Sequence, residues 1–203
     1  MGITPVFPEN WAPLCAAIGT NRKNFDYAAK RGFSGDLCGY FRNNVGYALD
    51  GINEENQPLN GLPAPDFLIS FGAGCIPTMK AFQVMCDHFK VPVFRADLPQ
   101  VAMEKIEERH IAYGVAQIKR LIRFLEDETG LKFDIDKLRQ AVIHTNEACR
   151  LCDEIMATRS TVPSPFSAAE IGIMFVMVTR HGTEIAVNFL KDVLRVVKEK
   201  VSR

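Results

Sequence analysis

The residues best suited to chemistry in this chain are two cysteines that follow similar glycine-containing loops. Cys75 lies in the stretch DFLISFGAGCIPTMK, where an apolar run ends in a glycine turn and a helix is expected to begin. Cys38 follows Gly35 and Asp36 in GDLCGYFRNN, with Asp36 as the expected helix cap and Cys38 in the first turn. Helix N-terminal amides stabilise a thiolate and any anionic cluster bound to it. The two positions together favour exposed, reactive thiols or metal ligands over packing.

The other four cysteines lead to a different interpretation. Cys15 and Cys86 fall on apolar helix faces, which predicts a packing role. Cys149 and Cys152 (CRLC) have the spacing of a metal or redox pair, but they lie well inside an expected helix, without the strand-to-helix turn of a thioredoxin-type motif. We therefore favour a structural role for this pair. The four histidines are too scattered to complete a zinc site.

Other kinds of active site find little support in the sequence. The turn GAGCIP lacks both the GxxxxGK[ST] and the GxGxxG pattern, so a nucleotide-binding loop is only weakly indicated. Nothing marks one serine as the nucleophile of a Ser-His-Asp triad. The acidic pairs Glu107 with Glu108 and Asp134 with Asp136 are expected on solvated faces.

Composition and charge narrow the classes of partner. The 203 residues are 47% apolar, which suits one globular domain with or without a helical appendage. The 24 basic side chains equal the 24 acidic ones, so we expect no nucleic acid and no anionic membrane as partner. The longest apolar stretch, Ile171–Thr179, is far shorter than the roughly 20 residues of a membrane-spanning helix. Six cysteines without a secretion signal predict a reducing, cytoplasmic location.

Residues 1–99 predict a partial α/β domain that carries both candidate cysteines. The expected elements are a strand over Gly2–Phe7, a loop at Pro8–Asn10, helices over Trp11–Ile18 and Arg22–Lys30, a helix capped by Asp36, a loop over Asp50–Pro65, a strand over Phe67–Phe71, a helix over Ile76–Phe89 and a strand over Val91–Phe94. The last three predict a right-handed crossover unit of a Rossmann-like or flavodoxin-like parallel sheet. Ligands of such sheets gather beyond the carboxyl ends of the strands, where Cys75 is expected.

Residues 100–203 predict a mainly helical region. Helices are expected over Gln100–Gly130, over Asp134–Ala157 and from Ala168 to the end, and TRSTVPSPFS connects the last two. The change of character near residue 100 places the boundary between the two parts there.

Four stretches resemble, in order and spacing, the iron-sulfur subunits of 2-hydroxyacyl-CoA dehydratases (the 2-hydroxyglutaryl-CoA dehydratase D-component type) and of the related ATP-dependent benzoyl-CoA reductases. They are GITPVFPEN, DLCGYFRNNVG, PAPDFLISFGAGCIPTMKAFQ and VPVFRADLP. The likeness covers most of the chain and is strongest before residue 100. Four motifs in register are much more specific than one isolated CxxC.

The resemblance implies a subunit that holds a 4Fe-4S cluster through three cysteines, with Cys38 and Cys75 matching the first two. The family's third cysteine belongs to a second α/β domain, and this chain has no cysteine after Cys152. Cys15, Cys149, Cys152 or a partner chain would have to replace it. We therefore expect an internal piece of a longer subunit, or a shortened relative.

The resemblance also implies partners and a substrate. The partners are a second related dehydratase subunit and a separate ATP-dependent iron-sulfur activator protein, and the substrate is an acyl-CoA. Glu9 and Asn10 match a loop of the family beside the first strand and are expected near the substrate, with helix capping as the alternative.

The implied function is radical dehydration of a 2-hydroxyacyl-CoA to an enoyl-CoA. One injected electron makes a ketyl radical of the thioester, which lowers the barrier to removing a β-proton and expelling the hydroxyl. In a benzoyl-CoA reductase, the runner-up, the electrons enter the aromatic ring instead. A non-catalytic α/β binding module with incidental cysteines and a fragment without independent activity are the remaining alternatives.

Overall fold

The computed structural model describes most of the chain: residues 2–52, 55–72, 75–99, 105–167 and 179–202. Packing divides the chain into two compact units, and each is described by itself. The α/β unit is Val6–Lys132, and the helical unit is Phe133–Arg203 together with Met1–Pro5. Helix α5, Glu108–Thr129, belongs to the α/β unit in this division. The predicted boundary near residue 100 stays a prediction.

The α/β unit begins with three helices: α1 (Pro8–Ile18), α2 (Asn21–Lys30) and α3 (Gly39–Gly46). Helix α1 opens on a proline, whose fixed φ suits a first helical position, and ends at Gly19 in the left-handed conformation. The loop predicted at Pro8–Asn10 is therefore wrong, because these residues form the first turn of α1. The strand predicted over residues 2–7 is also wrong, since no described strand pairs with this segment.

Helix α3 begins differently from the prediction. Its N-cap is Cys38, and Asp36 lies in a preceding turn, where its backbone N–H donates to the Ser34 hydroxyl at 3.2 Å. Asp36 is therefore not the cap. Beyond α3, a π-helical turn at Tyr47–Gly51 (η1) and a 3₁₀ turn at Pro58–Asn60 (η2) occupy part of the predicted loop.

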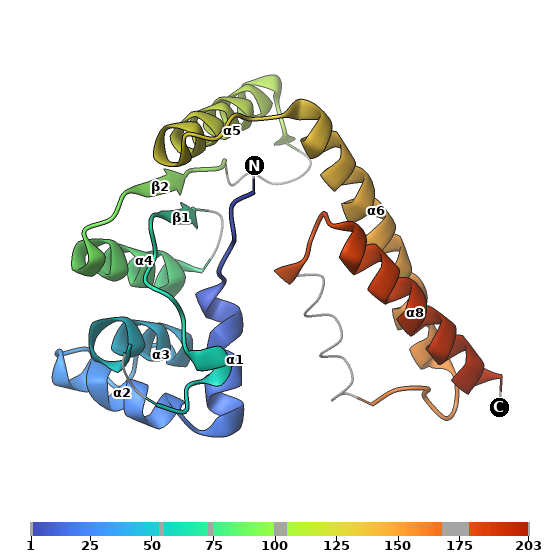
Figure 1. Cartoon of the computed structure of the whole chain (residues 1–203), viewed down its shortest axis with the longest axis horizontal. Coiled ribbons are helices and arrows are strands. Elements are labelled where there is room, and N and C mark those ends of the chain that lie inside the picture. The colour runs from blue at the N-terminus through green and yellow to red at the C-terminus, as the bar shows by residue number, and fades with distance from the viewer. Residues whose placement is uncertain (1, 53–54, 73–74, 100–104, 168–178, 203) are drawn as a thin grey trace. The chain divides into compact units, whose positions relative to one another are not determined.

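The predicted strand-helix-strand unit is confirmed. Its elements are β1 (Leu68–Phe71), α4 (Ile76–Phe89) and β2 (Val93–Ala96) (Figure 1). The two strands pair in parallel, with Leu68 opposite Val93 and Phe71 opposite Ala96. Phe124 of α5 packs against Phe94 of β2, with ring centroids 5.5 Å apart. The described part of the unit is thus α/β with a small two-stranded parallel sheet.

Buried amide side chains connect α2 with α3 and with the segment that precedes η2. The Nδ2 of Asn24 donates to Oδ1 of Asn43 at 2.9 Å, and Nε2 of Gln57 donates to Oδ1 of Asn24 at 3.4 Å. All three side chains are buried, so these bonds satisfy groups that would otherwise be costly to desolvate. Gly46 allows α3 to approach the Asn24 backbone here, because a Cβ at Gly46 would lie 1.8 Å from the Asn24 carbonyl oxygen.

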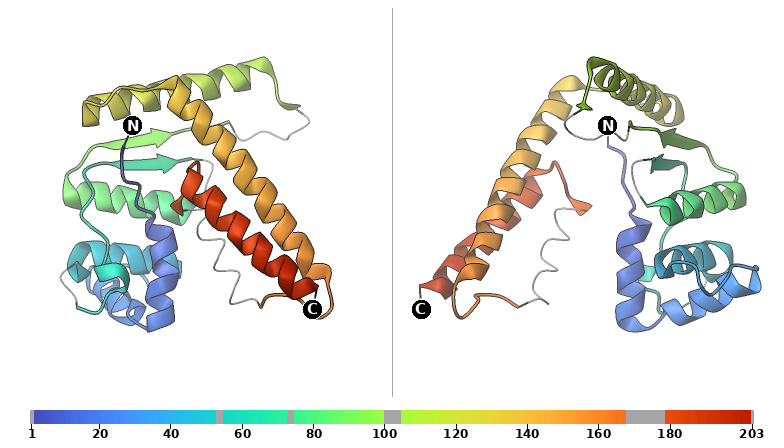
Figure 2. Two further views of the ribbon diagram at one scale, coloured as in Figure 1. Left: turned by 45° about the vertical axis from the view of Figure 1, so that its right-hand side comes forward. Right: turned by 180° about the vertical axis from the view of Figure 1, so that it is seen from behind.

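The helical unit is built on α6 (Ile135–Ala157) and α8 (Glu184–Val201), which run side by side in Figures 1 and 2. Asp134 caps α6 by accepting the N–H groups of Asp136 and Lys137 at 2.9 and 3.1 Å. The seam between the helices is apolar and includes Leu151, Ile155, Leu190 and Leu194. The predicted helix over Asp134–Ala157 is confirmed, with Asp134 as its cap.

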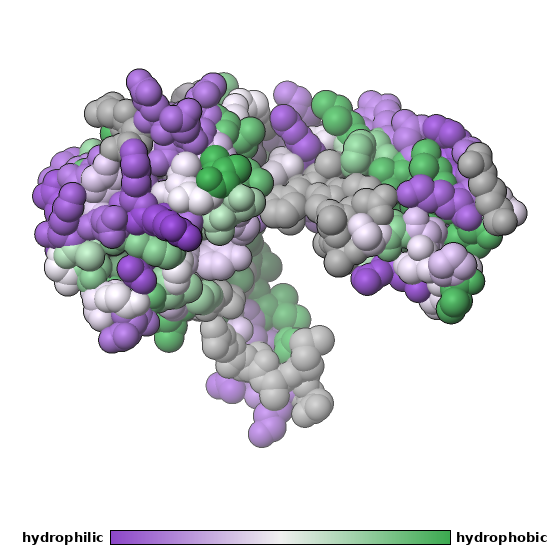
Figure 3. Space-filling view, turned by 90° about the horizontal axis from the view of Figure 1, so that it is seen from below, coloured by the Kyte–Doolittle hydropathy of each residue, from purple (hydrophilic) through white to green (hydrophobic). Residues whose placement is uncertain are grey.

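Parts of the other predicted helices fall outside the described residues. These parts are residues 100–104 of the first predicted helix and residues 168–178 of the last, including most of the apolar stretch Ile171–Thr179. The predicted stop at Gly130 is confirmed, since Gly130 has φ 68 directly after α5. No helix of the described ranges is long and apolar enough to cross a membrane. On the face drawn in Figure 3, polar side chains interrupt the apolar surface.

The close approach at Gly46 predicts a strong effect of a single methyl group. Gly46→Ala should lower the free energy of unfolding by about 1–3 kcal/mol, because the backbone oxygen of Asn24 must move. Gly114→Ala on α5 is the matched control, since its Cβ would meet nothing within 4 Å and the change should be neutral or stabilising. Urea unfolding of both variants measures the difference, and equal stability of the two would contradict the packing described here.

The ion pair between Arg31 and Asp50 predicts a pH effect. Arg31 donates to both carboxylate oxygens of Asp50, at 2.8 and 2.6 Å, and this hydrogen bonding holds the pKa of Asp50 below its usual range. A carboxyl pKa that folding lowers stabilises the fold above its unfolded pKa, and this contribution is lost as pH falls through the folded pKa. An NMR titration should find the Asp50 pKa raised in Arg31→Gln and unchanged in Arg123→Gln. An unchanged pKa in Arg31→Gln would contradict the pairing.

Candidate functional site

The two predicted cluster cysteines are the N-cap residues of α3 and α4. Cys38 (φ −47, ψ 135) and Cys75 (φ −72, ψ 127) both have non-helical backbone conformations and precede the first helical residue. The carbonyl of Cys38 accepts the N–H of Arg42 at 3.0 Å, and that of Cys75 accepts the N–H of Met79 at 3.3 Å. Both cysteines are free and exposed. Each thiol is therefore accessible at the positive end of a helix dipole.

Helices α3 and α4 run parallel, which brings their N-terminal ends together. Phe41 and Val45 of α3 cluster with Ala81 in the first half of α4, whereas Ala48, just beyond α3, clusters with Met85 in the second half. Because residues farther along α3 contact residues farther along α4, the two helices run in the same direction. Cys38 and Cys75 consequently lie at the same end of the helix pair. The carboxyl end of β1 is directed toward this end, because the chain runs from β1 to Cys75.

A small cavity of about 10 Å³, with room for roughly one water molecule, lies between the first turn of α1 and the facing sides of α3 and α4. It is lined by Pro8, Glu9, Tyr40, Phe41, Asn44, Thr78, Ala81, Phe82 and Met85. The Thr78 hydroxyl donates a short hydrogen bond to the Glu9 carboxylate, which ties the start of α1 to the start of α4. The three helix starts and the two cysteines thus share one end of the α/β unit.

The structure separates the two residues predicted to be near substrate. Glu9 lines the pocket, whereas Asn10 does not, and its Nδ2 is buried without a hydrogen-bond partner among the described residues. The N-cap of α1 is Phe7, and no side chain caps this helix. Glu9 and Asn10 therefore do not share one site, and their predicted place near the substrate stays a prediction.

The two thiols fit only part of a cluster's ligand set. Iron-sulfur clusters are held by thiolates, and accessible thiols at helix N-termini suit that role. Within the described ranges, however, no group of three or more His, Cys, Asp or Glu side chains is placed to hold a metal ion. Cys38 and Cys75 can therefore supply two ligands, and further ligands would have to come from elsewhere.

The packing roles predicted for Cys15 and Cys86 are confirmed. Cys15 is fully buried against Trp11 and Tyr47, and burial raises the pKa of its thiol. Cys86 is half-buried, and its Sγ donates to the Val91 carbonyl at 3.3 Å.

The CRLC pair divides between the core and the surface of the helical unit. Cys152 belongs to the apolar seam between α6 and α8, and burial raises the pKa of its thiol. Cys149 is exposed. The structural role that we favoured for the pair therefore suits Cys152 and does not describe Cys149.

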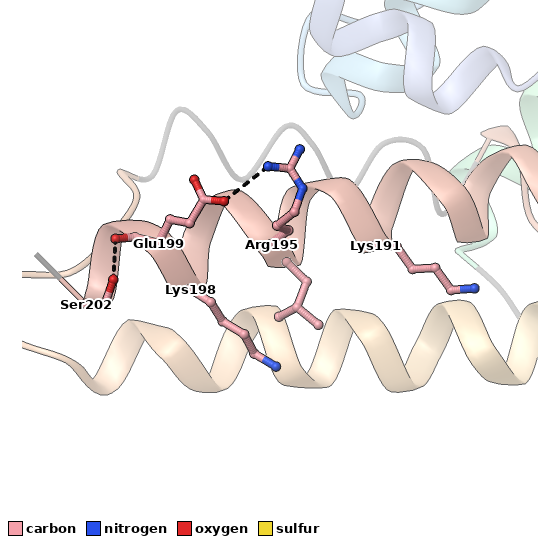
Figure 4. A pocket seen from close by; sticks show the side chains of 6 residues that line it. Lys191, Arg195, Lys198, Glu199 and Ser202 are labelled. Atoms are coloured by element: carbon pink, nitrogen blue, oxygen red, sulfur yellow. Dashed lines mark hydrogen bonds and ion pairs between the residues drawn. The ribbon is translucent and has the colours of Figure 1, made fainter.

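A second pocket lies along α8 in the helical unit (Figure 4). It is lined by Lys191, Leu194, Arg195, Lys198, Glu199 and Ser202. Arg195 pairs with Glu199 at 3.2 Å, and Lys198 pairs with Glu154 of α6 at 3.2 Å. Carboxylates thus pair with two of the three cations of the lining, Arg195 and Lys198, and the third is Lys191. We place the candidate site in the α/β unit because it carries the two exposed N-cap thiols.

Sequence reasoning missed three polar residues of the first pocket: Tyr40, Asn44 and Thr78. One signal was present for Asn44. Asparagine is a poor helix former, so the pair Asn43–Asn44 in the middle of an expected helix indicates buried polar contacts. Thr78 carries no such signal, because its partner Glu9 is 69 positions away in the chain.

The comparisons with known proteins agree on one family. The family model described as 2-hydroxyglutaryl-CoA dehydratase, D-component, matches residues 1–203. The chain is 29% identical over 202 residues to the (R)-phenyllactyl-CoA dehydratase alpha subunit of Clostridium sporogenes, covering 99% of this chain and 49% of that one. It is 30% identical over 151 residues to a benzoyl-CoA reductase subunit of Thauera aromatica, covering 73% and 34%.

A third relative is the (R)-2-hydroxyisocaproyl-CoA dehydratase alpha subunit of Clostridioides difficile. It is 28% identical over 167 residues, which cover 82% of this chain and 40% of that one. The chain thus spans about half, or less, of the length of the curated relatives it matches.

The exposure of the cysteines predicts which thiols react in the native, reduced chain. Iodoacetamide should label Cys38, Cys75 and Cys149 rapidly, and Cys15 and Cys152 slowly, because burial raises the pKa of the latter two. Peptide mass spectrometry over a time course measures the order, and labelling in urea is the control that makes all sites accessible. Slow labelling of Cys38 or Cys75 in the native chain would contradict their placement at the surface.

Proposed function

Because this chain belongs to the 2-hydroxyglutaryl-CoA dehydratase D-component family, we propose that it is part of the iron-sulfur subunit of a 2-hydroxyacyl-CoA dehydratase. The reaction removes water from a 2-hydroxyacyl-CoA and yields an enoyl-CoA. The observation that carries the proposal is the pair of exposed N-cap thiols, Cys38 and Cys75, at one end of two parallel helices. A second related subunit and an ATP-dependent iron-sulfur activator complete the proposed system, in the reducing environment of the cytoplasm.

Cys38 and Cys75 would supply two of the thiolate ligands of a 4Fe-4S cluster. Such a cluster would supply single-electron transfer to the thioester, which the proposed ketyl dehydration requires. The chain's own contribution is positional. Both cysteines directly precede the first turns of α3 and α4, and their exposure leaves an electron donor free to approach.

The α/β unit would supply this site as part of a larger Rossmann-like sheet. Parallel strands are usually buried within sheets of several strands, and β1 and β2 pair only with each other among the described residues. Further strands would come from the part of the relatives' length that this chain does not span.

Membership of an ATP-dependent benzoyl-CoA reductase is the second candidate. Its support is the 30% identity to the benzoyl-CoA reductase relative of Thauera aromatica. The same two cysteines would then serve electron transfer into an aromatic ring. Incubating the complex and an activator with a 2-hydroxyacyl-CoA or with benzoyl-CoA separates the two functions, since only one thioester class should be consumed.

The cluster proposal predicts a spectroscopic loss in a double variant. The chain, coproduced with the proteins encoded beside it and reconstituted anaerobically with iron and sulfide, should turn brown through thiolate-to-iron charge transfer. Cys38→Ser, Cys75→Ser should lose this absorbance and most of the bound iron, because two ligands are removed. Cys86→Ser is the matched control, as this half-buried cysteine is not a candidate ligand and serine can keep its hydrogen bond to the Val91 carbonyl.

Two outcomes would contradict the cluster proposal. One is a wild-type preparation that stays colourless after reconstitution. The other is a double variant that keeps the iron and sulfide content of the wild type. The second result would favour a binding module whose cysteines are incidental.

A further inference from the structure

Arg42 connects the first turn of α3 to the loop of residues 34–38, which ends at Cys38. Its Nη1 donates to the carbonyl oxygen of Gly35 at 2.9 Å. Its backbone N–H donates to the carbonyl oxygen of Cys38 at 3.0 Å. One residue therefore bonds to the loop twice, through its side chain at Gly35 and through its backbone at Cys38.

An aromatic ring of α2 holds the guanidinium of Arg42 from the other side. The Cζ of Arg42 lies 4.3 Å from the centroid of the Phe25 ring, which is a cation–π contact. The planar guanidinium can stack on a ring and donate to a carbonyl at the same time. Arg42 is half-buried as a result, and its position between α2 and the loop is fixed.

Packing alone does not explain a guanidinium at this place. The Nε of Arg42 is buried without a hydrogen-bond partner among the described residues, and such a donor is costly. An apolar side chain could contact Phe25 without this cost. The side-chain partners of Arg42, a carbonyl and a ring, carry no net charge, so neither neutralises its positive charge. Gly35 and Cys38 are three residues apart, so their Cα atoms lie within about 11 Å of each other and the charge lies close to the thiol's loop.

The second exposed cysteine has no equivalent of this cation. Met79 follows Cys75 by four positions, the place that Arg42 has after Cys38. The N–H of Met79 donates to the Cys75 carbonyl at 3.3 Å, as that of Arg42 does to the Cys38 carbonyl. The two helix starts thus share a backbone arrangement and differ in charge. The start of α4 can therefore serve as an internal reference for the start of α3.

We propose that Arg42 is the positioning residue of Cys38. Its side chain fixes the loop of residues 34–38 and places a positive charge in that loop, so Cys38 and Cys75 are not equivalent as ligands. A cluster gains a negative charge when it is reduced, and a nearby cation favours the reduced form. The inference rests on the proposed function for what Cys38 binds, whereas the fixing of the loop requires no cluster.

The first test is hydrogen exchange, measured by NMR on the reduced, metal-free chain. Arg42→Met keeps an unbranched apolar stem and loses both the donor and the charge. The amides of Asp36 and Leu37, which are bonded within the loop, should exchange about tenfold faster in this variant. The Met79 amide should keep its wild-type rate. Arg123→Met, at an exposed position of α5, is the matched control and should change neither loop nor reference.

The second test is the reduction potential of the cluster, reconstituted anaerobically in the coproduced complex and titrated with EPR detection. Arg42→Met should make the potential more negative, because the reduced form loses a neighbouring cation. Arg42→Lys keeps a charge and a donor, so it should restore the potential and bring the exchange of the loop to within about threefold of the wild type. A purely structural role for Arg42 would not make the potential follow the charge.

A further variant covers the case in which Arg42→Met does not fold. Phe25→Leu keeps the arginine and removes the ring on which it stacks, so the amides of Asp36 and Leu37 should exchange about threefold faster. The Met79 amide should again keep its rate. Unchanged exchange of the loop in Phe25→Leu would overturn the assignment.

The remaining outcomes separate this inference from the proposed function. Unchanged exchange of the loop in Arg42→Met, equal acceleration at Met79, or a potential that is the same in wild type, Arg42→Met and Arg42→Lys would overturn the positioning role. An equal shift of the potential in the two Arg42 variants would overturn it as well. A wild-type protein that stays colourless, together with faster exchange of the loop in Arg42→Met, would overturn the cluster and leave the positioning of Cys38 standing.

Discussion

The parallel packing of α3 against α4 is the constraint on which the candidate site depends. An apolar seam that runs from Phe41 and Ala81 to Ala48 and Met85 holds the helices in one direction. Parallel helices place both N-caps at the same end, although 37 positions (75 − 38) separate the two cysteines in the chain. An antiparallel arrangement would place the thiols at opposite ends of the pair. The helix direction, more than any feature of the cysteines themselves, therefore decides whether they can share a ligand.

Helix α3 is positioned from its other side by polar contacts that tolerate little change. Asn24 bonds to Asn43 within the core, and the absence of a side chain at Gly46 lets the α3 backbone approach that of α2. Amide hydrogen bonds are directional, so they fix the rotation of α3 about its axis as well as its distance from α2. An apolar seam alone would permit sliding and rotation. The same rotation places Asn44, which accepts a hydrogen bond from Asn43, in the lining of the small cavity between α3 and α4.

Most of the correct predictions came from local sequence patterns. Several wrong ones concern contacts that the local sequence does not reveal. Helix α4 was predicted at its observed bounds, because a glycine turn precedes it and its apolar spacing is regular. The strand predicted over residues 2–7 failed, since strand formation needs a partner that local sequence does not reveal. Asp36 failed as a cap because its carboxylate accepts from the Ser34 hydroxyl and α3 begins only at Gly39. The positions of Cys38 and Cys75 at helix starts were predictable, but the pocket beside them depends on contacts across dozens of residues.

Charges of both signs meet at the end of the α/β unit that carries the two exposed cysteines. Helix N-termini carry partial positive charges, and Cys38 and Cys75 lie at two of them. Glu9 returns a full negative charge to the same end, and its hydrogen bond to Thr78 keeps that charge at the pocket. The partial positive charges of the helix ends and the carboxylate of Glu9 thus lie at the same end of the unit. The cavity between the helices has room for about one water molecule, so the exposed thiols are the accessible groups at this end.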